Sequence, residues 1–262
     1  MLFRSIHSLM MLPGLALCLS AAPLPGSAGA ARAEVGASPA SAPLKRPPYR
    51  VIRQGMFALS RIDSAPVVML GDSLTEGAQW AEITGCPYLA NRGISADDSA
   101  GVLKRLDDVI RLKPAAVFLM IGVNDVASGV PTTTIAENVQ QTIATLTRAG
   151  ARVYLTLVLP VGQSYRRPIN AKIDELNAAY REIAQEEKKE VEVVDFRAGM
   201  RTDAGFLRDE LSVDGLHLMP EAYRVWRDAI GPLVEKHCSS SENPTSAATP
   251  RLANGRRQGW PR

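Results

Sequence analysis

Short apolar runs alternate with amphipathic stretches along the middle of this 262-residue chain. Two of the runs, 116–121 and 153–158, are apolar on both faces, as expected of strands that helices cover on each side. The runs that predict β-strands are 67–70, 88–90, 116–121, 153–158 and 191–194, of which 88–90 is the weakest.

Helical periodicity fills the intervals between these runs. Pro220 opens the last predicted helix, and the pair Gly231-Pro232 predicts a bend or a frayed turn near its end. Strand–helix alternation indicates an α/β fold with a parallel sheet, in which functional sites form at the carboxyl ends of the strands. The segments whose apolar residues fall on one helical face are 49–62, 102–110, 135–146, 169–183 and 220–236.

The two ends of the chain differ from this middle part. Residues 1–33 combine a short basic start, an apolar stretch too short to cross a bilayer and two A-x-A sites, which predicts a cleaved secretory signal. A disordered apolar N-terminus, or a lipoprotein anchored at Cys18, are the alternatives. The organisation predicted is a signal peptide 1–33, an Ala/Pro/Ser-rich linker 34–48, one domain 49–237 and a disordered tail 238–262, in a periplasmic or secreted protein.

The net charge of +3 comes from these ends. Two arginines and no acid give residues 1–33 a charge of +2, and four arginines against one glutamate give 238–262 a charge of +3, so 34–237 carries −2. A slightly acidic domain with only 5% aromatic residues does not indicate a nucleic-acid-binding surface. No stable membrane insertion is expected once the signal is removed, because no apolar run is long enough.

Three of the predicted strands lead into small polar motifs. The first leads into residues 71–77, where Ser73 would sit on a tight strand-to-helix turn with its backbone N–H at a helix N-terminus. Ser73 acting only as a helix cap is the alternative. Gly93 ends the Asn-Arg-Gly sequence after the second strand, and Asn124 follows the third. Both offer N–H donors at the same sheet edge, and an ordinary turn is the alternative for each.

An Asp-x-x-His motif follows near the C-terminus. A serine hydroxyl is a poor nucleophile until a base takes its proton. The base works best when a carboxylate holds it in the right tautomer. Asp214 and His217 can supply both from one turn. His7 leaves with the predicted signal and His237 lies at the end of the last predicted helix, so His217 is the usable base; a purely structural histidine is the alternative. The histidine and cysteine pattern predicts no metal site.

Cysteine usage leaves one pairing open. Cys18 leaves with the predicted signal, whereas Cys86 and Cys238 remain. An exported protein would permit a disulfide between them, and two unrelated thiols are the alternative.

Taken in this order, the four motifs resemble those of the GDSL esterase/lipase family, also called SGNH hydrolases, over about residues 65–235. Ser73, Gly93, Asn124 and His217 match the four name-giving residues, and Asp214 matches the family's Asp-x-x-His. The resemblance implies a three-layer α/β/α sandwich with a flavodoxin-like sheet of five parallel strands. It also implies that Ser73 is the nucleophile, His217 the general base and then acid, and Asp214 its support. The Ser73 and Gly93 N–H groups and the Asn124 side chain would form the oxyanion hole, with no metal or organic cofactor.

The function expected is a secreted or periplasmic serine esterase that hydrolyses short-chain or O-acetyl esters through an acyl-enzyme. Its partner is then a small-molecule or glycan acyl ester. Two alternatives stay open: an acyltransferase or deacetylase acting on exopolysaccharide or cell-wall glycan, and a non-hydrolytic binding module on the same fold. Intact Ser73, Asp214 and His217 argue against the binding module. Catalytic residues do not distinguish water from a sugar hydroxyl as acceptor, and the oligomeric state is left open.

Substrate contacts are predicted in two places. In the loop after the fourth strand, Tyr165 could stack on a sugar ring, and Arg166 or Arg167 could hold a carboxylate or phosphate. A solvated basic loop is the alternative. Trp80, just after the Ser73 motif, either lines the site or packs in the core. Short connections without helical insertions favour an open site for short acyl groups or acylated glycans over a buried lipid tunnel.

Overall fold

The computed structural model describes residues 48–187 and 189–238. The predicted signal peptide 1–33, the linker up to residue 47 and the tail from residue 239 onward lie outside the described residues. Among the helices of the described part, none combines the length and the apolar character that crossing a membrane requires.

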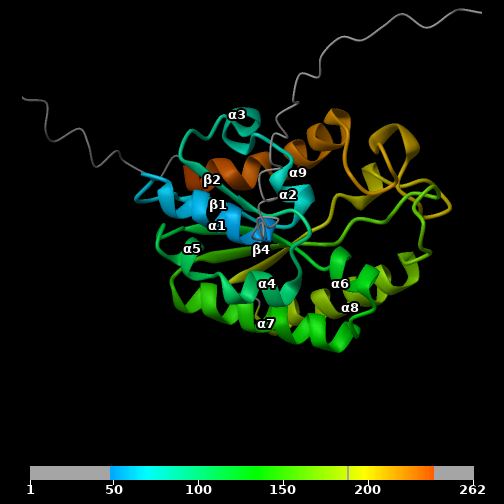
Figure 1. The fold of residues 1–262 in the computed structure, drawn as a ribbon, viewed down its shortest axis with the longest axis horizontal. Helices are drawn as coiled ribbons and strands as arrows, with labels where there is room; N and C mark the ends of the chain where they lie inside the picture. The colour runs from blue at the N-terminus through cyan, green and yellow to red at the C-terminus, as the bar shows by residue number, and fades with distance from the viewer. Residues whose placement is uncertain (1–47, 188, 239–262) are drawn as a thin grey trace, which may run out of the picture. The chain divides into compact units, whose positions relative to one another are not determined.

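Strands and helices alternate along the described chain (Figure 1). The strands are β1 (Val67–Gly71), β2 (Leu89–Gly93), β3 (Ala116–Met120), β4 (Arg152–Thr156) and β5 (Val191–Val194). The helices are α1 (Tyr49–Leu59), α2 (Ser73–Glu76), α3 (Trp80–Thr84), α4 (Ser99–Lys104), α5 (Asp107–Ile110), α6 (Val123–Ser128), α7 (Thr132–Arg148), α8 (Asn170–Glu186) and α9 (Pro220–Cys238), with 3₁₀ turns at Arg197–Gly199 and Asp209–Leu211.

The five strands form one parallel sheet in the order β2-β1-β3-β4-β5. This confirms the prediction of an α/β fold with five parallel strands in flavodoxin-like order. The chain leaves β1 towards one side for β2 and then returns past β1 to β3. At such a reversal of strand order, the loops after neighbouring strands diverge and leave a crevice at the carboxyl edge. Ser73 follows β1 and Asn124 follows β3, so the topology brings both motifs to this crevice.

Both faces of the sheet are buried, which explains the apolar runs. Val68 and Leu70 of β1 point into a core that α4, α7 and α8 close. Val67 and Met69 point into a second core with Trp80 of α3 and residues of α9. Figure 1 shows α7 and α8 on one side of the sheet and α3 and α9 on the other. Because successive strand residues face opposite sides, two helical layers require strands that are apolar throughout.

Two predicted helices differ from the structure. The segment 102–110 was expected to be one helix but forms α4 and α5, because Arg105 leaves helical geometry between them. Its buried guanidinium turns inward, where Nε donates to Asp97 Oδ2 at 2.7 Å. The last helix does not fray at Gly231-Pro232; Pro232 lies inside α9, which continues to Cys238.

Candidate active site

Ser73 is the first residue of α2, directly after a sharp turn out of β1. The turn needs Gly71, because a Cβ there would collide with Met120 O of the neighbouring strand. The helix is capped by Asp72, whose Oδ1 accepts the Leu74 N–H at 2.9 Å. The Ser73 side chain is partly exposed and makes no hydrogen bond within the described residues. Capping is therefore the role of Asp72, and the Ser73 hydroxyl stays available.

Asp72 is buried beneath this turn, and burial raises the pKa of its carboxyl group to about 7. The Leu74 N–H opposes this shift, the negative charges of Asp97 and Asp125 add to it, and His217 lowers the pKa. His217 thus contributes to the electrostatic environment of Asp72, although 145 positions separate the two residues in the sequence.

Asp214 and His217 form a hydrogen-bonded pair on one small loop. His217 Nδ1 lies 2.7 Å from Asp214 Oδ2, and the backbone N–H groups of Leu216 and His217 donate to Asp214 Oδ1. Burial alone would raise the pKa of Asp214, but these hydrogen bonds and the charge of His217 hold it below its usual value. An ionised carboxylate only accepts, so Nδ1 of His217 is the donor in this pair, and Nε2 is the ring nitrogen that faces away from it. Both side chains are about half exposed, at 50% and 49%.

The loop after β4 supports the Asp-His loop through Gly215. Gly215 has a left-handed φ of +81°, and a Cβ there would lie 2.8 Å from Tyr165 N. The Gly162 N–H donates to Gly215 O at 2.7 Å. This close approach requires glycine and fixes the position of the Asp214–His217 pair against the loop 162–165.

The three predicted oxyanion donors differ in what they already bind. The Ser73 N–H starts a helix, where N–H groups have no intrahelical partner. Asn124 Nδ2 donates one hydrogen to Asp97 O at 2.8 Å, which leaves its second hydrogen for a ligand. The Gly93 N–H already donates to Asn91 Oδ1 at 2.8 Å. Gly93 can therefore bind an oxyanion only by sharing or exchanging this hydrogen bond.

Asn91 has a role that the sequence reading did not assign. Its Nδ2 lies 3.1, 3.2 and 3.0 Å from the carbonyl oxygens of Thr75, Glu76 and Ala78, which follow Ser73. A Cβ on Gly93 would come within 2.6 Å of Glu76 Cα, so the end of β2 and α2 are in direct backbone contact. Asn91 thus ties the predicted nucleophile helix to the strand that carries Gly93. Its place in the Asn-Arg-Gly motif was the only signal in the sequence.

A buried charged network holds the segment between β2 and α4. Arg105 and Arg50 both pair with Asp97, each at 2.7 Å. Asp125 accepts the Ser99 N–H at 3.0 and 3.1 Å and the Ser99 hydroxyl at 2.6 Å. Since Asp97 O also accepts from Asn124, this segment fixes the predicted oxyanion donor on α6. Within residues 48–187 and 189–238, no three His, Cys, Asp or Glu side chains converge in a way that could hold a metal ion.

The structure buries one of the predicted substrate contacts and leaves the other two at least partly exposed. Trp80 is 1% exposed, packs against Trp226 and donates from Nε1 to Thr75 O at 2.7 Å. Of its two alternatives, packing in the core is confirmed and lining the site is wrong. The physical reason is that the ring fills the core beneath α2. Tyr165 is half-buried against the core, and Arg166 is exposed without a hydrogen bond or ion pair in the described chain. Substrate contact by these two stays a prediction.

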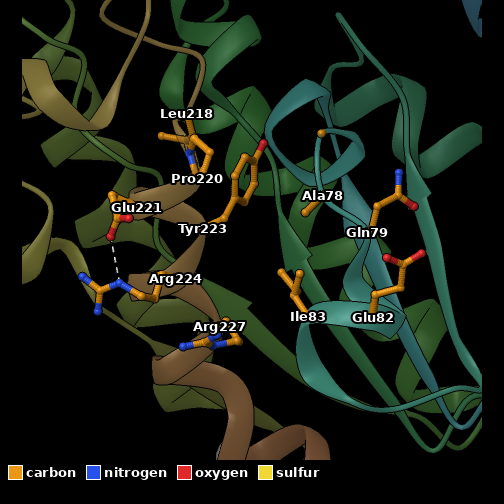
Figure 2. Close-up of a pocket in the computed structure, with 11 residues that line it drawn as sticks. Ala78, Gln79, Glu82, Ile83, Leu218, Pro220, Glu221, Tyr223, Arg224 and Arg227 are labelled. Carbon is orange, nitrogen blue, oxygen red and sulfur yellow. Dashed lines mark hydrogen bonds and ion pairs between the residues drawn. The ribbon is translucent and has the colours of Figure 1, made fainter.

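A groove of about 550 Å³ opens between the α2–α3 connection and the start of α9 (Figure 2). Gly77, which directly follows α2, lines one wall, and Leu218, which directly follows His217, lines the other. Ala78, Pro220 and Tyr223 add apolar surface. The groove therefore lies between the segments that follow Ser73 and His217 in the chain, and neither of these two residues is among those that line it. Sequence reasoning did not find it, because its walls come from segments about 140 residues apart.

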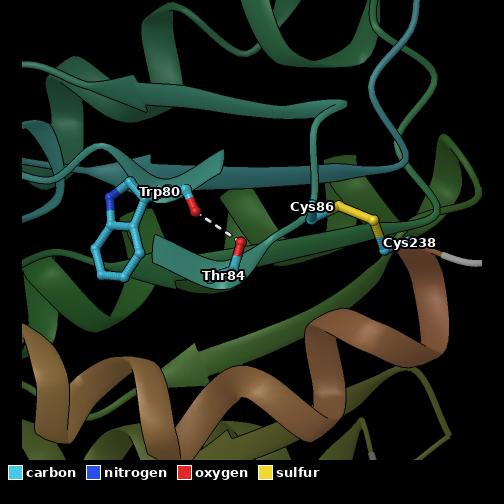
Figure 3. Close-up of a disulfide and its surroundings, with 4 residues drawn as sticks. All are labelled: Trp80, Thr84, Cys86 and Cys238. Atoms are coloured by element: carbon cyan, nitrogen blue, oxygen red, sulfur yellow. Dashed lines mark hydrogen bonds between the residues drawn. A yellow bond between two sulfur atoms is a disulfide. The ribbon is translucent and has the colours of Figure 1, made fainter. Parts of the chain in front are cut away.

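Cys86 and Cys238 form a disulfide with a Cα–Cα distance of 5.8 Å (Figure 3). Cys86 lies in the connection from α3 to β2, and Cys238 is the last residue of α9. The bond thus ties the end of α9 to the α3 side of the sheet. It closes a loop with a sequence separation of 152 residues.

The family model described as GDSL-like lipase/acylhydrolase matches residues 69–225, more than half of the chain. The chain belongs to this family. This match confirms the resemblance to SGNH hydrolases seen in the sequence motifs. The chain is an acylhydrolase of the esterase type, and membership of the family implies that its substrates are esters.

Solved structures agree with this assignment. A GDSL-like lipase from Bacteroides thetaiotaomicron is 27% identical with a TM-score of 0.62, over 71% of this chain and 97% of that one. An acetyl xylan esterase (21% identity, TM-score 0.57, 64% of this chain and 98% of that one) shares the fold. So does an esterase from Pseudoalteromonas sp. inhibited by monoethylphosphonate (21%, 0.52, 65% and 96%). A comparison with curated proteins finds no match.

Gly215→Ala tests the support of the Asp-His loop. We expect turnover of p-nitrophenyl acetate to fall by roughly tenfold to a hundredfold, because the new Cβ displaces the loop that carries His217. Gly205→Ala is the matched control: its φ is +84° and nothing lies within 4 Å of the added Cβ. Both variants incur a similar backbone penalty of about 1–2 kcal/mol, visible in thermal unfolding. Equal turnover in the two variants would show that the close contact at Gly215 has no catalytic consequence.

Asp72→Asn tests the buried carboxyl group. The folded-state pKa of about 7 exceeds the usual value of 3.8, so the native state binds the extra proton. Wild-type stability therefore falls as pH rises between these two values, whereas the amide of the variant does not titrate and can still cap Leu74. We expect urea unfolding to show that the free energy of unfolding of the variant, relative to wild type, rises with pH across this window by up to about 4 kcal/mol. Exposed Asp203→Asn is the control. A difference in stability independent of pH would contradict the assignment.

Cys86→Ser and Cys238→Ser test the disulfide. Each should lower the free energy of unfolding in guanidinium by about 2–4 kcal/mol, since the bond restricts the unfolded chain. The double variant and reduced wild type should match the single variants. If reductant leaves the unfolding curve of wild type unchanged, the bond contributes nothing to stability.

Proposed function

We propose that this acylhydrolase is an exported serine esterase that hydrolyses short acyl esters, O-acetyl esters in particular. The observation that carries the proposal is the 2.7 Å Asp214–His217 hydrogen bond on the loop that leads into α9, whose Tyr223 donates to Leu74 O of α2, where Ser73 presents an uncommitted hydroxyl. In this role Ser73 is the nucleophile, His217 the base and Asp214 the group that orients the base.

The acylation half-reaction follows from this arrangement. His217 Nε2 takes the Ser73 proton as Oγ bonds to the ester carbonyl carbon, and the carbonyl oxygen becomes an oxyanion. The Ser73 N–H and the second Nδ2 hydrogen of Asn124 are available to stabilise that charge. The bond to the alcohol oxygen then breaks, and that oxygen takes the proton from Nε2. Ionised Asp214 stabilises the imidazolium between the two transfers.

Deacylation repeats the sequence with water. Water loses a proton to Nε2 as its oxygen attacks the acyl carbon, and the collapse of the second oxyanion returns the proton to Ser73 Oγ and releases the carboxylic acid. A sugar hydroxyl in place of water would make the same step an acyl transfer. Half-exposed Asp214 and His217 leave room for either acceptor.

Two features support the remaining parts of the proposal. The half-exposed Asp-His pair favours a small acyl group and a bulky alcohol that reaches in from solvent over a fully enclosed lipid chain. The Cys86–Cys238 disulfide fits an oxidising compartment, and residues 1–33 have the pattern of an export signal.

Ser73→Ala and His217→Ala test the mechanism. On p-nitrophenyl acetate, butyrate and octanoate, wild type should prefer the shorter esters. Each variant should lose several powers of ten in kcat, of the order of 10⁴-fold, because triad members act as a unit. Circular dichroism should show an unchanged fold, and a phosphonate ester should add covalently to Ser73 in wild type only. Wild-type turnover by Ser73→Ala would rule the proposal out.

Product analysis with acceptor sugars present separates hydrolysis from transfer. Free carboxylic acid as the main product supports the esterase. Predominant formation of an acylated sugar would replace the esterase with an acyltransferase that uses the same residues.

A further inference from the structure

Helix α1 packs against the rest of the domain with its polar side. Arg50 pairs with Asp97 at 2.7 Å, and Arg53 pairs with Glu76 at 2.9 Å. Phe57 is the only buried residue of the helix. A surface helix ordinarily turns its apolar stripe towards the core and its charged residues towards water. In α1 this arrangement is reversed, and both of its arginines are used by ion pairs within the domain.

The opposite side of α1 is apolar and exposed. Six of the nine large apolar side chains that are exposed in the described chain lie between residues 49 and 62. Figure 1 shows α1 in blue, beside α5. Exposed apolar side chains gathered in one place mark an interaction site more often than single ones do. We call these six residues the α1 stripe: Tyr49, Val51, Ile52, Met56, Leu59 and Ile62.

The spacing of the α1 stripe is the same in both directions along the chain. From its centre between Gly55 and Met56, Ile52 and Leu59 are equally far in sequence, and Tyr49 and Ile62 are the next equidistant pair. Steps of three or four residues keep such positions on one side of a helix. A twofold contact between identical chains needs this symmetry, because residue i of one copy meets residue j of the other while j meets i.

Gly55 makes a gap at the centre of the stripe. Nothing lies within 4 Å of the position that a Cβ on Gly55 would take. The adjacent Met56 is 55% exposed, and its unbranched side chain adapts to irregular spaces. In an antiparallel pair of α1 helices, Met56 would lie over the partner's Gly55, and Ile52 would lie against the partner's Leu59. Ridges of side chains then fill the grooves of the facing helix, as in other helix pairs.

Other occupants fit the stripe less well. A helix that lies on a lipid surface carries Lys or Arg beside its apolar side to bind the headgroups. The charged residues of α1 are Arg50 and Arg53, and both are paired within the domain. A partner of different sequence would give no reason for the symmetric spacing. A second copy of this chain accounts for both observations.

We propose that α1 forms the interface of a twofold dimer of this chain, in which two α1 helices pack antiparallel and cross at Gly55 and Met56. The proposal goes beyond the esterase function and does not depend on it. One short helix per copy offers less than the roughly 800 Å² per partner of a standard interface. We therefore expect a dissociation constant in the micromolar range.

Analytical ultracentrifugation of the full chain, up to about 200 µM, measures this constant. Met56→Glu should weaken dimerisation by about a hundredfold or more, because two carboxylates meet at the twofold axis. Gly55→Leu should weaken it by about tenfold, since the new side chain fills the space of the partner's Met56. This second variant adds apolar surface and raises helix propensity, so neither unfolding nor lower hydrophobicity explains a loss. Tyr88→Glu is the matched control, because Tyr88 is 50% exposed between α3 and β2, and it should dimerise like wild type.

The double variant Ile52→Cys/Leu59→Cys tests the antiparallel register. Its two cysteines lie seven residues apart, about 10 Å along the helix, which is too far for a disulfide within one chain. In the dimer each would meet the other cysteine of its partner. We expect mild oxidation to give a covalent dimer of the double variant only. The two single variants should stay uncrosslinked, because their equivalent cysteines are also about 10 Å apart along the axis. Wild type controls for Cys18.

Each contrary result overturns the proposal in its own way. Wild type that stays monomeric at about 200 µM has no such interface. If it dimerises only after residues 1–47 are removed, that segment covers the stripe. A dimer that tolerates both Met56→Glu and Gly55→Leu uses another face. If Gly55→Leu strengthens association, the stripe acts as unspecific apolar surface. Binding of monomeric wild type to phosphatidylcholine vesicles, lost in Met56→Glu, would assign the stripe to a lipid surface.

Discussion

The site depends on a helix too short to hold itself together. In this single turn the Gly77 N–H donates to Ser73 O, but the carbonyl groups of Leu74, Thr75 and Glu76 have no intrahelical partner. Side chains from three other elements bind these groups: Tyr223 donates to Leu74 O, Trp80 to Thr75 O, and Asn91 to Thr75 O and Glu76 O. Asn91 also donates to Ala78 O, just beyond α2. The backbone contact at Gly93 brings β2 against the same turn. The position of Ser73 is therefore set from α3, β2 and α9 together.

Buried carboxylates form the second layer of this arrangement. Asp72, Asp97 and Asp125 lie close enough for the charges of the last two to raise the pKa of Asp72. Among the described residues, Asp97 pairs with the charge of Arg105, Asp125 accepts hydrogen bonds from Ser99, and Asp72 accepts one hydrogen bond, from the Leu74 N–H. Proton uptake by Asp72 is the less costly state, because an unpaired charge in the interior is strongly disfavoured. Burial is thus the main cause of the raised pKa of Asp72, and the charges of Asp97 and Asp125, in the network that holds Asn124, add to it.

Predictions from local sequence patterns were wrong or incomplete where a side chain contacts a residue in another element of the fold. The apolar face of 102–110 resembles one helix, yet the buried Arg105 guanidinium turns to Asp97 and separates α4 from α5. Trp80 follows the Ser73 motif and still packs against Trp226, since both lie on the same side of the sheet. Asn91 was visible only as part of a motif, because its partners lie in another element. The groove between the α2–α3 connection and the start of α9 has walls from two segments far apart in the sequence, so neither segment alone indicated it.

The sequence by itself determined the strand pattern, the parallel sheet and the motifs at its carboxyl edge, because periodicity and strand-end position are properties of neighbouring residues. It also determined the Asp214–His217 pair, which a single turn brings together. The tertiary structure decided which groups remain free to react. The Gly93 N–H is bound by Asn91, and Cys86 forms a disulfide with Cys238. Asp72 caps α2, so the Ser73 hydroxyl is not needed as a cap. These outcomes depend on contacts between segments far apart in the chain, and such contacts exist only after the sheet has brought the segments together.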